Sequence, residues 1–130
     1  MSQENVDKLR RAYEFFNRGD FDAAVAIAHS DVEFFPPGDQ APFRGAERFR
    51  AWMEPDAFES QVFEPLELTA AGNKILVHQN TKVRGAGSGI ELELRSWTVW
   101  TFDDEGLITR VENFWAHDKA KALEAAGLSE

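Results

Sequence analysis

The first third of the chain carries apolar residues at helical spacing. From Gln3 to Arg18 they recur three and four positions apart, which marks one face of an amphipathic helix. Gly19 and Asp20 then interrupt the pattern, and Asp20 is placed to cap a second, alanine-rich helix over residues 21–30. The apolar face of the first helix consists of Val6, Leu9, Ala12, Tyr13 and Phe16.

A short strand and a third helix come next. Residues 31–35 alternate like a strand that ends at Pro36, since proline cannot donate a hydrogen bond to a sheet. From about Gly45 the helical period returns, and Pro55 is expected to end that helix. Its buried face is predicted to consist of Phe49, Trp52 and Met53.

The second half of the chain changes to a period of two. Residues 62–70, 74–84, 90–102 and 107–115 read as four long strands joined by turns and a glycine-rich hairpin. Residues 117–127 then predict a terminal helix that ends at a glycine. The pattern predicts an α+β fold with one domain over residues 1–130, in which three N-terminal helices pack on a curved antiparallel sheet.

The longest strand has large side chains on both faces. Trp97 and Val99 face one way, and Thr98 and Trp100 face the other. A face that carries Trp97 is poorly suited to water, so we expect a partner sheet to cover it in a homodimer.

Composition narrows the function classes. A formal charge of −9 argues against a nucleic-acid partner, and the absence of cysteine removes thiolate chemistry and disulfides. The polar, acidic start of the chain is unlike a signal peptide, and no apolar run is long enough for a membrane span, so we expect a cytoplasmic protein without a membrane partner. No HxH, HExxH, GxGxxG, P-loop or GxSxG motif is present, which predicts no metal and no cofactor.

Five stretches carry a resemblance that covers nearly the whole chain. The chain resembles the SnoaL-like, ketosteroid isomerase-related branch of the nuclear transport factor 2-like superfamily. That resemblance implies a cystatin-like α+β roll, a conical barrel with a cavity between helices and sheet, and commonly a dimer through the sheet. The stretches are FNRGDFDAAVAIAHSDVEFFPP, FRGAERFRAW, GSGIELE, WTVWTFDDEGLITRVENFW and KALEAAGL.

The isomerase residues do not carry over onto this chain. The resemblance places the carboxylate base at Phe34 or Phe35, neither of which can accept a proton. It places the oxyanion tyrosine at Ala12, beside Tyr13, and the acidic oxyanion partner at Thr98. Isomerase chemistry of that kind is therefore not expected.

The same alignment predicts an aromatic cavity with a few neutral polar groups, which is the usual composition of a small-molecule site. Strand alternation adds inward-facing residues to the rings of the helices. The predicted ligand-binding residues are Phe16, Phe34, Phe49, Trp52, Gln79, Thr81, Thr98, Trp100, Asn113 and Trp115.

Histidines and carboxylates are the candidates for acid–base chemistry. His117 shares the inward parity of Trp115 and is the first choice, whereas His29 is expected to end the second helix and His78 to face away from the cavity. Glu33 faces inward only if its strand shifts by one residue. The catalytic candidates are His117, Tyr13 and Glu33; for each of them a purely structural role is the alternative.

Three functions stay open at this point. The first is a SnoaL-like protein that binds a small apolar or aromatic molecule in an aromatic cone. The second is a cofactor-free isomerase, cyclase or hydrolase that acts on a polyketide- or steroid-like substrate. The third is a non-catalytic dimeric scaffold whose cavity is filled by its own side chains.

Overall fold

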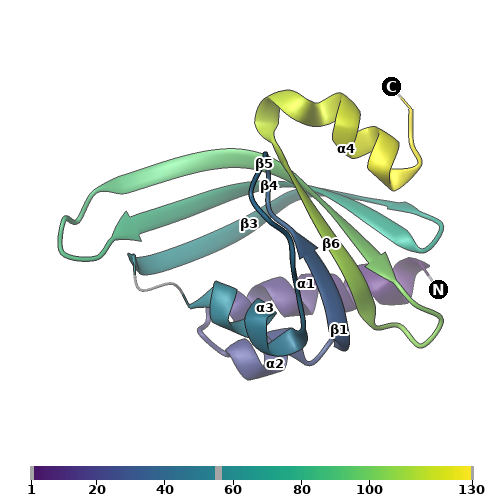
Figure 1. Ribbon diagram of the computed structural model, residues 1–130, viewed down its shortest axis with the longest axis horizontal. Coiled ribbons are helices and arrows are strands. Elements are labelled where there is room, and N and C mark those ends of the chain that lie inside the picture. Colours follow the sequence, from purple (N-terminus) through teal and green to yellow (C-terminus); the bar gives the residue numbers. More distant parts are fainter. Residues whose placement is uncertain (1, 55–56, 130) are drawn as a thin grey trace.

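A computed structural model describes residues 2–54 and 57–129 of the chain, and Pro55 lies outside these ranges. Helices α1 to α3 lie on one side of a curved sheet and α4 on the other (Figure 1). No helix in the two described ranges is long and apolar enough to cross a membrane. The elements are α1 (Ser2–Asn17), α2 (Phe21–Val25), β1 (Ala28–Phe35), β2 (Phe43–Arg44), α3 (Ala46–Met53), β3 (Phe58–Ala71), β4 (Lys74–Gly85), β5 (Glu91–Phe102), β6 (Ile108–Trp115), a 3₁₀ turn (Ala116–Asp118) and α4 (Lys119–Ala126).

The six strands form one sheet in the order β2-β1-β6-β5-β4-β3. Strands β3 to β6 are antiparallel neighbours, as predicted, but β1 pairs with β6 in parallel. The sheet is therefore mixed, and the prediction of a purely antiparallel sheet is wrong in this one pair. A parallel pair needs a long connection, which α3 and strands β2 to β5 provide between β1 and β6 along the chain. The predicted α+β roll is confirmed.

Helix α1 forms as its pattern predicts. Leu9, Tyr13 and Phe16 are buried against the sheet, and the polar positions between them face outward. The helix ends where Gly19 takes a φ of +81°, a conformation that residues with a Cβ rarely adopt. Asp20 then accepts a hydrogen bond from the backbone N–H of Ala23 at 3.3 Å, which confirms it as the cap of α2.

The prediction for the second helix is wrong in length. Helix α2 ends at Val25, and the chain enters β1 at Ala28. His29 therefore lies in a strand, where its Nδ1 accepts a hydrogen bond from the N–H of Asp31 at 3.0 Å, and it does not end a helix. Pairing with β6 overrides the helical propensity of the alanines. The two-residue strand β2 was not predicted.

Helix α4 covers the outer face of the sheet at β5. Val99 is fully buried there against Ala122 and Ala126 of α4, and Trp97 packs at the margin of the same cluster. The predicted alternation along β5 is confirmed. Because α4 shields this face, the presence of Trp97 there is not a reason to expect a partner sheet.

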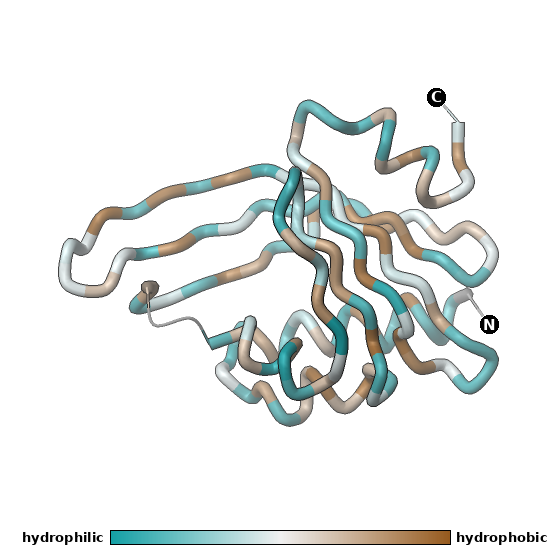
Figure 2. Tube along the Cα trace, viewed as in Figure 1, coloured by the Kyte–Doolittle hydropathy of each residue, from teal (hydrophilic) through white to brown (hydrophobic). Residues whose placement is uncertain are grey.

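The ends of β3, β4 and β5 reach beyond the helices (Figure 1). We call this extension the arm. Apolar and polar residues alternate along its strands (Figure 2), so one of its faces is apolar and uncovered. The exposed large apolar residues of these strands and their connection are Phe58, Val62, Leu66, Ile90, Leu92 and Leu94. Val62 pairs with Lys82 and therefore lies on the other face of the arm, away from Leu92 and Leu94.

The docking of α4 gives a test of the fold. Ala122 has no exposed surface, so Ala122→Leu should overpack the contact with the sheet and lower the free energy of unfolding by about 1–3 kcal/mol. Ala120→Leu, at an exposed position of the same helix, should leave it within about 0.5 kcal/mol. Urea denaturation measures both, and equal effects would contradict the position of α4.

Candidate functional site

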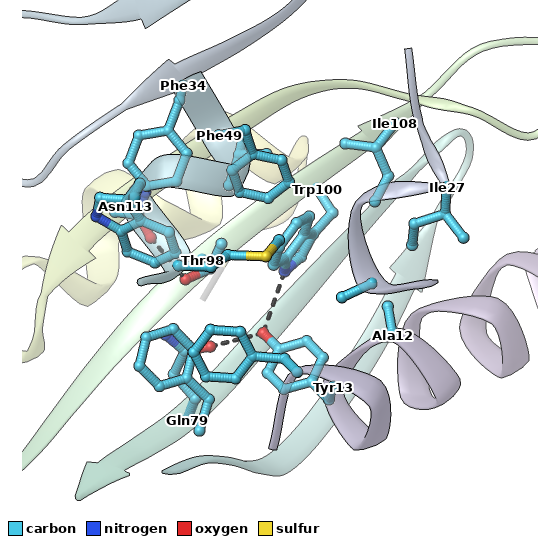
Figure 3. A pocket seen from close by; sticks show the side chains of 16 residues that line it. Ala12, Tyr13, Ile27, Phe34, Phe49, Gln79, Thr98, Trp100, Ile108 and Asn113 are labelled. Atoms are coloured by element: carbon cyan, nitrogen blue, oxygen red, sulfur yellow. Dashed lines mark hydrogen bonds between the residues drawn. The ribbon is translucent and has the colours of Figure 1, made fainter. Parts of the chain in front are cut away.

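A pocket lies between the three N-terminal helices and the inner face of the sheet (Figure 3). Small residues of α1 and α2 leave the space, and rings of α1, α3, β1, β3 and β5 form its wall. The polar groups come from Tyr13 of α1 and from strands β4 to β6. The lining residues are Ala12, Tyr13, Phe16, Ala24, Ile27, Phe34, Phe49, Trp52, Met53, Phe63, Gln79, Thr98, Trp100, Ile108, Val111 and Asn113.

Phe34 is the centre of the aromatic wall. Its ring centroid lies 4.7 Å from that of Phe43, 5.6 Å from Phe49 and 4.6 Å from Trp52. The segment that ends β1 therefore contributes the ring of Phe34 to the pocket and no carboxylate. Phe34 is almost fully buried, because the alternation of β1 turns it inward and turns Glu33 outward.

A second group of rings separates the pocket from a surface groove. Phe63 stacks on Phe16 at 4.7 Å and lies 5.7 Å from Trp52. Phe16 and Met53 line both the pocket and the groove, and Phe63 and Trp52 are half-buried. These side chains therefore lie between the pocket and the groove.

The first polar chain of the pocket runs through Tyr13 (Figure 3). The indole N–H of Trp100 donates to the Tyr13 hydroxyl at 3.3 Å, and that hydroxyl donates to Oε1 of Gln79 at 2.6 Å. Nε2 of Gln79 donates in turn to Ser96 at 3.3 Å. Tyr13 and Gln79 are buried, so this series of hydrogen bonds gives partners to polar groups whose burial without one would cost free energy.

The second polar chain joins β5, β6 and β1. The hydroxyl of Thr98 donates to Oδ1 of Asn113 at 3.0 Å, and Nδ2 of Asn113 donates to the carbonyl of Phe35 at 3.0 Å. Neutral groups thus provide all the hydrogen bonds inside the pocket.

Tyr13 is the one titratable residue among those that line the pocket. Burial raises its pKa well above the ordinary value near 10, and the hydrogen bond from Trp100 offsets only part of this. Tyr13 therefore stays a neutral phenol and does not act as a base near neutral pH.

The open space inside the pocket is small. It amounts to about 40 Å³, room for roughly three water molecules. Sites for drug-sized ligands have about 300–1,000 Å³. Most of the cone is therefore filled by its own rings, and a ligand of any size requires side chains to move.

The structure brings most of the predicted site residues together. Besides Tyr13, eight of the ten predicted ligand-binding residues line the pocket, whereas Thr81 and Trp115 do not. Trp115 lies against the loop after β1, where a Cβ added to Gly38 would be 3.1 Å from its Nε1. Thr81 lies farther along β4, beside Phe63 and Leu94 of the neighbouring strands. The eight are Phe16, Phe34, Phe49, Trp52, Gln79, Thr98, Trp100 and Asn113.

Two of the three catalytic candidates lie outside the pocket. The side chain of His117 is 79% exposed, and its Nε2 lies 3.7 Å from Asp118. Glu33 pairs with Arg44 at 3.0 Å on the surface. His78 faces the opposite side of the sheet, as predicted, and stacks on Trp97 at 4.1 Å.

Sequence reasoning missed several apolar lining residues. Phe63 lies on a predicted strand, and its parity could have been used, but the register of that strand against β4 was unknown. Ala24 and Ile27 were assigned to the second helix without a face. No group of three or more His, Asp or Glu side chains that could hold a metal occurs in residues 2–54 and 57–129.

The comparisons with known proteins agree with this geometry. Residues 9–111 match the model of the SnoaL-like domain. The chain belongs to the SnoaL-like family. This places it in the nuclear transport factor 2-like superfamily, as the resemblance implied, whereas no curated protein sequence matches it.

Solved structures share the fold of this SnoaL-like domain at low identity. The epoxide hydrolase/cyclase-like enzyme SalBIII, described in pyran ring formation in the polyether salinomycin, superposes with a TM-score of 0.79, 20% identity and coverage of 89% of this chain and 93% of its own. A protein of Xanthomonas campestris pv. campestris proposed to be a polyketide cyclase superposes with a TM-score of 0.78 and 22% identity, and the match covers 91% of this chain and 94% of its own. TerC, co-crystallised with polyporic acid, superposes with a TM-score of 0.74 and 21% identity, and the match covers 88% of this chain and 93% of its own. At these identities the likeness establishes the fold alone.

Tyr13 is the only tyrosine of the chain, so its ionisation can be followed directly. Its folded pKa is raised, so below pH 10 both folded and unfolded states keep the proton and its ionisation does not change stability. Above about pH 10 the unfolded state loses the proton first, and the free energy of unfolding should fall as pH rises.

Ultraviolet absorbance should therefore show no phenolate at pH 11 while the chain is folded. In Tyr13→Phe the part of the alkaline loss of stability that comes from this residue should disappear. That variant should also lose about 1–3 kcal/mol at neutral pH, since the Trp100 N–H and Gln79 lose their partner. A phenolate signal near pH 10 in the folded chain would contradict the burial of Tyr13.

Proposed function

We propose that this SnoaL-like domain binds a small, largely apolar molecule in the aromatic pocket and orients it with neutral polar groups. The observation that carries the proposal is the composition of the wall: apolar and aromatic residues surround Tyr13, Gln79, Thr98 and Asn113, and none of the lining residues is charged. A few placed polar groups in an apolar cavity are typical of small-molecule sites.

Acid–base catalysis has no support from the pocket. A general base must reach the proton that it removes, and no carboxylate or imidazole lines the space. A cyclase, isomerase or hydrolase acting on a polyketide- or steroid-like substrate would have to work by positioning, through Tyr13, Thr98 and Asn113. The descriptions of SalBIII and the Xanthomonas protein favour this second candidate only by analogy of fold.

A ligand would enter if the side chains between the pocket and the groove move. Trp52 and Phe63 are half-buried, and rotation of their rings would join the pocket to the groove beside Met53. A flat molecule that replaces part of this ring contact would recover stacking energy of about 0.5–1.5 kcal/mol per ring pair. Flat, uncharged compounds of one or two rings are therefore the ligands that we expect.

Filling the pocket from α1 tests the proposal. Indole and naphthalene, at ten times their dissociation constants, should stabilise the natural chain by about 1.4 kcal/mol and raise its melting temperature by several degrees. Ala12→Leu adds carbons inside the pocket and should weaken binding at least about 10-fold, whereas Ala51→Leu, at an exposed position of α3, should not.

Thermal denaturation and tryptophan fluorescence report both effects. Equal binding by the Ala12→Leu and Ala51→Leu variants would place the ligand elsewhere. If no compound of the panel shifts the melting temperature of the natural chain, the binding proposal is wrong. The small open volume would then favour the alternative of a scaffold whose cavity is filled by its own rings.

We also propose that two copies associate through the sheet, at the arm. Leu92 and Leu94 are 61% and 50% exposed, and they share the parity of Thr98 on β5, which places them on the inner side. The other side of the arm carries charged pairs such as Arg84 with Glu91. Because each copy carries a net charge of −9, an uncharged surface is the favourable place for two copies to meet.

Polar substitutions on each side of the arm test which of its two faces carries the association. The double variant Leu92→Gln, Leu94→Gln should weaken association at least about 10-fold in sedimentation equilibrium, because apolar area is lost from the contact. The matched control Glu91→Gln, Glu93→Gln should change it less than about 3-fold. A natural chain that is monomeric at all concentrations would refute the association.

A further inference from the structure

The orientation of Asn113 is fixed by the backbone. Its Nδ2 donates to the carbonyl of Phe35 at 3.0 Å, and a carbonyl can only accept. Turning the amide over would place two acceptors against each other. Oδ1 of Asn113 therefore faces Thr98.

This arrangement decides how Thr98 uses its hydroxyl. The hydroxyl has one proton, and it donates that proton to Oδ1 of Asn113 at 3.0 Å. Oγ1 of Thr98 is thus left with lone pairs and no proton for a ligand. Thr98 is 1% exposed and lies on the pocket wall beside Asn113 (Figure 3).

Tyr13 repeats the pattern on the other polar chain. The indole N–H of Trp100 can only donate, so the Tyr13 oxygen accepts from it, and the Tyr13 proton goes to Gln79 at 2.6 Å. Both hydroxyls of the pocket lining therefore direct their protons at amide oxygens of the protein. What they offer to the interior is acceptor capacity.

The absence of charged residues among those that line the pocket also favours a neutral ligand. No lysine, arginine or histidine lines the pocket, so a carboxylate or enolate would lose its hydration without a partner of opposite charge. Such desolvation costs several kcal/mol. A neutral donor does not carry this cost, because it replaces a hydrogen bond to water with one to a buried oxygen.

We propose that the ligand of the pocket is uncharged at its buried end and carries an O–H or N–H donor that Oγ1 of Thr98 accepts. This inference rests on the proposed binding function and names the class of ligand: a neutral hydroxyl- or amine-bearing ring compound. The resemblance to ketosteroid isomerases implied a hydrogen-bond donor at position 98. In this chain Thr98 directs its proton at Asn113 instead.

Four probes of similar size test the inference by calorimetry at pH 7. Phenol carries a neutral donor, toluene and anisole carry none, and benzoate is an anion. Phenol should bind about 3- to 10-fold more tightly than toluene or anisole, the value of one net hydrogen bond, and benzoate should bind more weakly than all three. Each measurement is repeated in Trp52→Ala, which widens the pocket and leaves both polar chains in place.

Substitutions of Thr98 assign the effect to one atom. In Thr98→Val, which keeps the shape and removes the hydroxyl, the ratio of phenol to toluene affinity should fall to within about 2-fold of one. In Thr98→Ser, which keeps the hydroxyl, the preference should persist. The ratio within each variant cancels changes in pocket volume, so a merely structural role of Thr98 would not alter it.

The outcomes separate the two proposals. If toluene or anisole binds the natural chain as tightly as phenol, or benzoate binds best, the donor inference is wrong and the binding function stands. If none of the four probes binds to the natural chain or to Trp52→Ala, both proposals are wrong. The comparison of probes in the unaltered chain is decisive by itself if Thr98→Val does not fold.

Discussion

The C-terminal half of β5 has to bury both of its faces, and the packing of helices on the sheet follows from this constraint. Thr98 and Val99 are adjacent, and both are almost fully buried, yet they point in opposite directions. One face needs the N-terminal helices and the other needs α4. An antiparallel sheet with one solvated face would not require a helix on each side. The pocket exists because the three N-terminal helices cover the inner face of β5 with rings that do not quite fill the space.

The buried polar groups turn this packing into a chemical site. Burial inside an aromatic wall requires each donor to find an acceptor, and the backbone carbonyl of Phe35 sets the first link. From that link the directions of the Asn113 amide and the Thr98 hydroxyl follow without further freedom. The chemistry that the pocket can offer is thus determined by which hydrogen-bond donors and acceptors are already paired, and not by charged groups. Under the proposed binding function, such a site would select and orient molecules through neutral hydrogen bonds, and no carboxylate or imidazole is among the residues that line it.

The sequence predicted the elements that depend on local periodicity. It did not predict the features that depend on pairing between strands far apart along the chain. The family alignment pointed to Phe34 and Thr98, and strand alternation then placed Trp100 on the same inner face. It could not show that β1 runs parallel to β6, or that this pairing would shorten α2. The alignment put Trp115 inward and alternation put Thr81 inward. In the structure neither lines the pocket: Thr81 lies beside Phe63 and Leu94, and Trp115 lies against the loop at Gly38.

The bond between Tyr13 and Gln79 joins residues 66 positions apart, and neither periodicity nor the family alignment could reveal it. The alignment placed Ala12 at the tyrosine position, yet both neighbours line the pocket. Stability gives little reason to keep a polar pair such as Thr98 and Asn113 here, since apolar residues of the same shape can be as stable. What the pair adds is a condition on any molecule that enters, which must satisfy the free lone pairs of Thr98 or leave them without water. Selectivity is therefore the physical consequence of this pair that packing alone cannot provide.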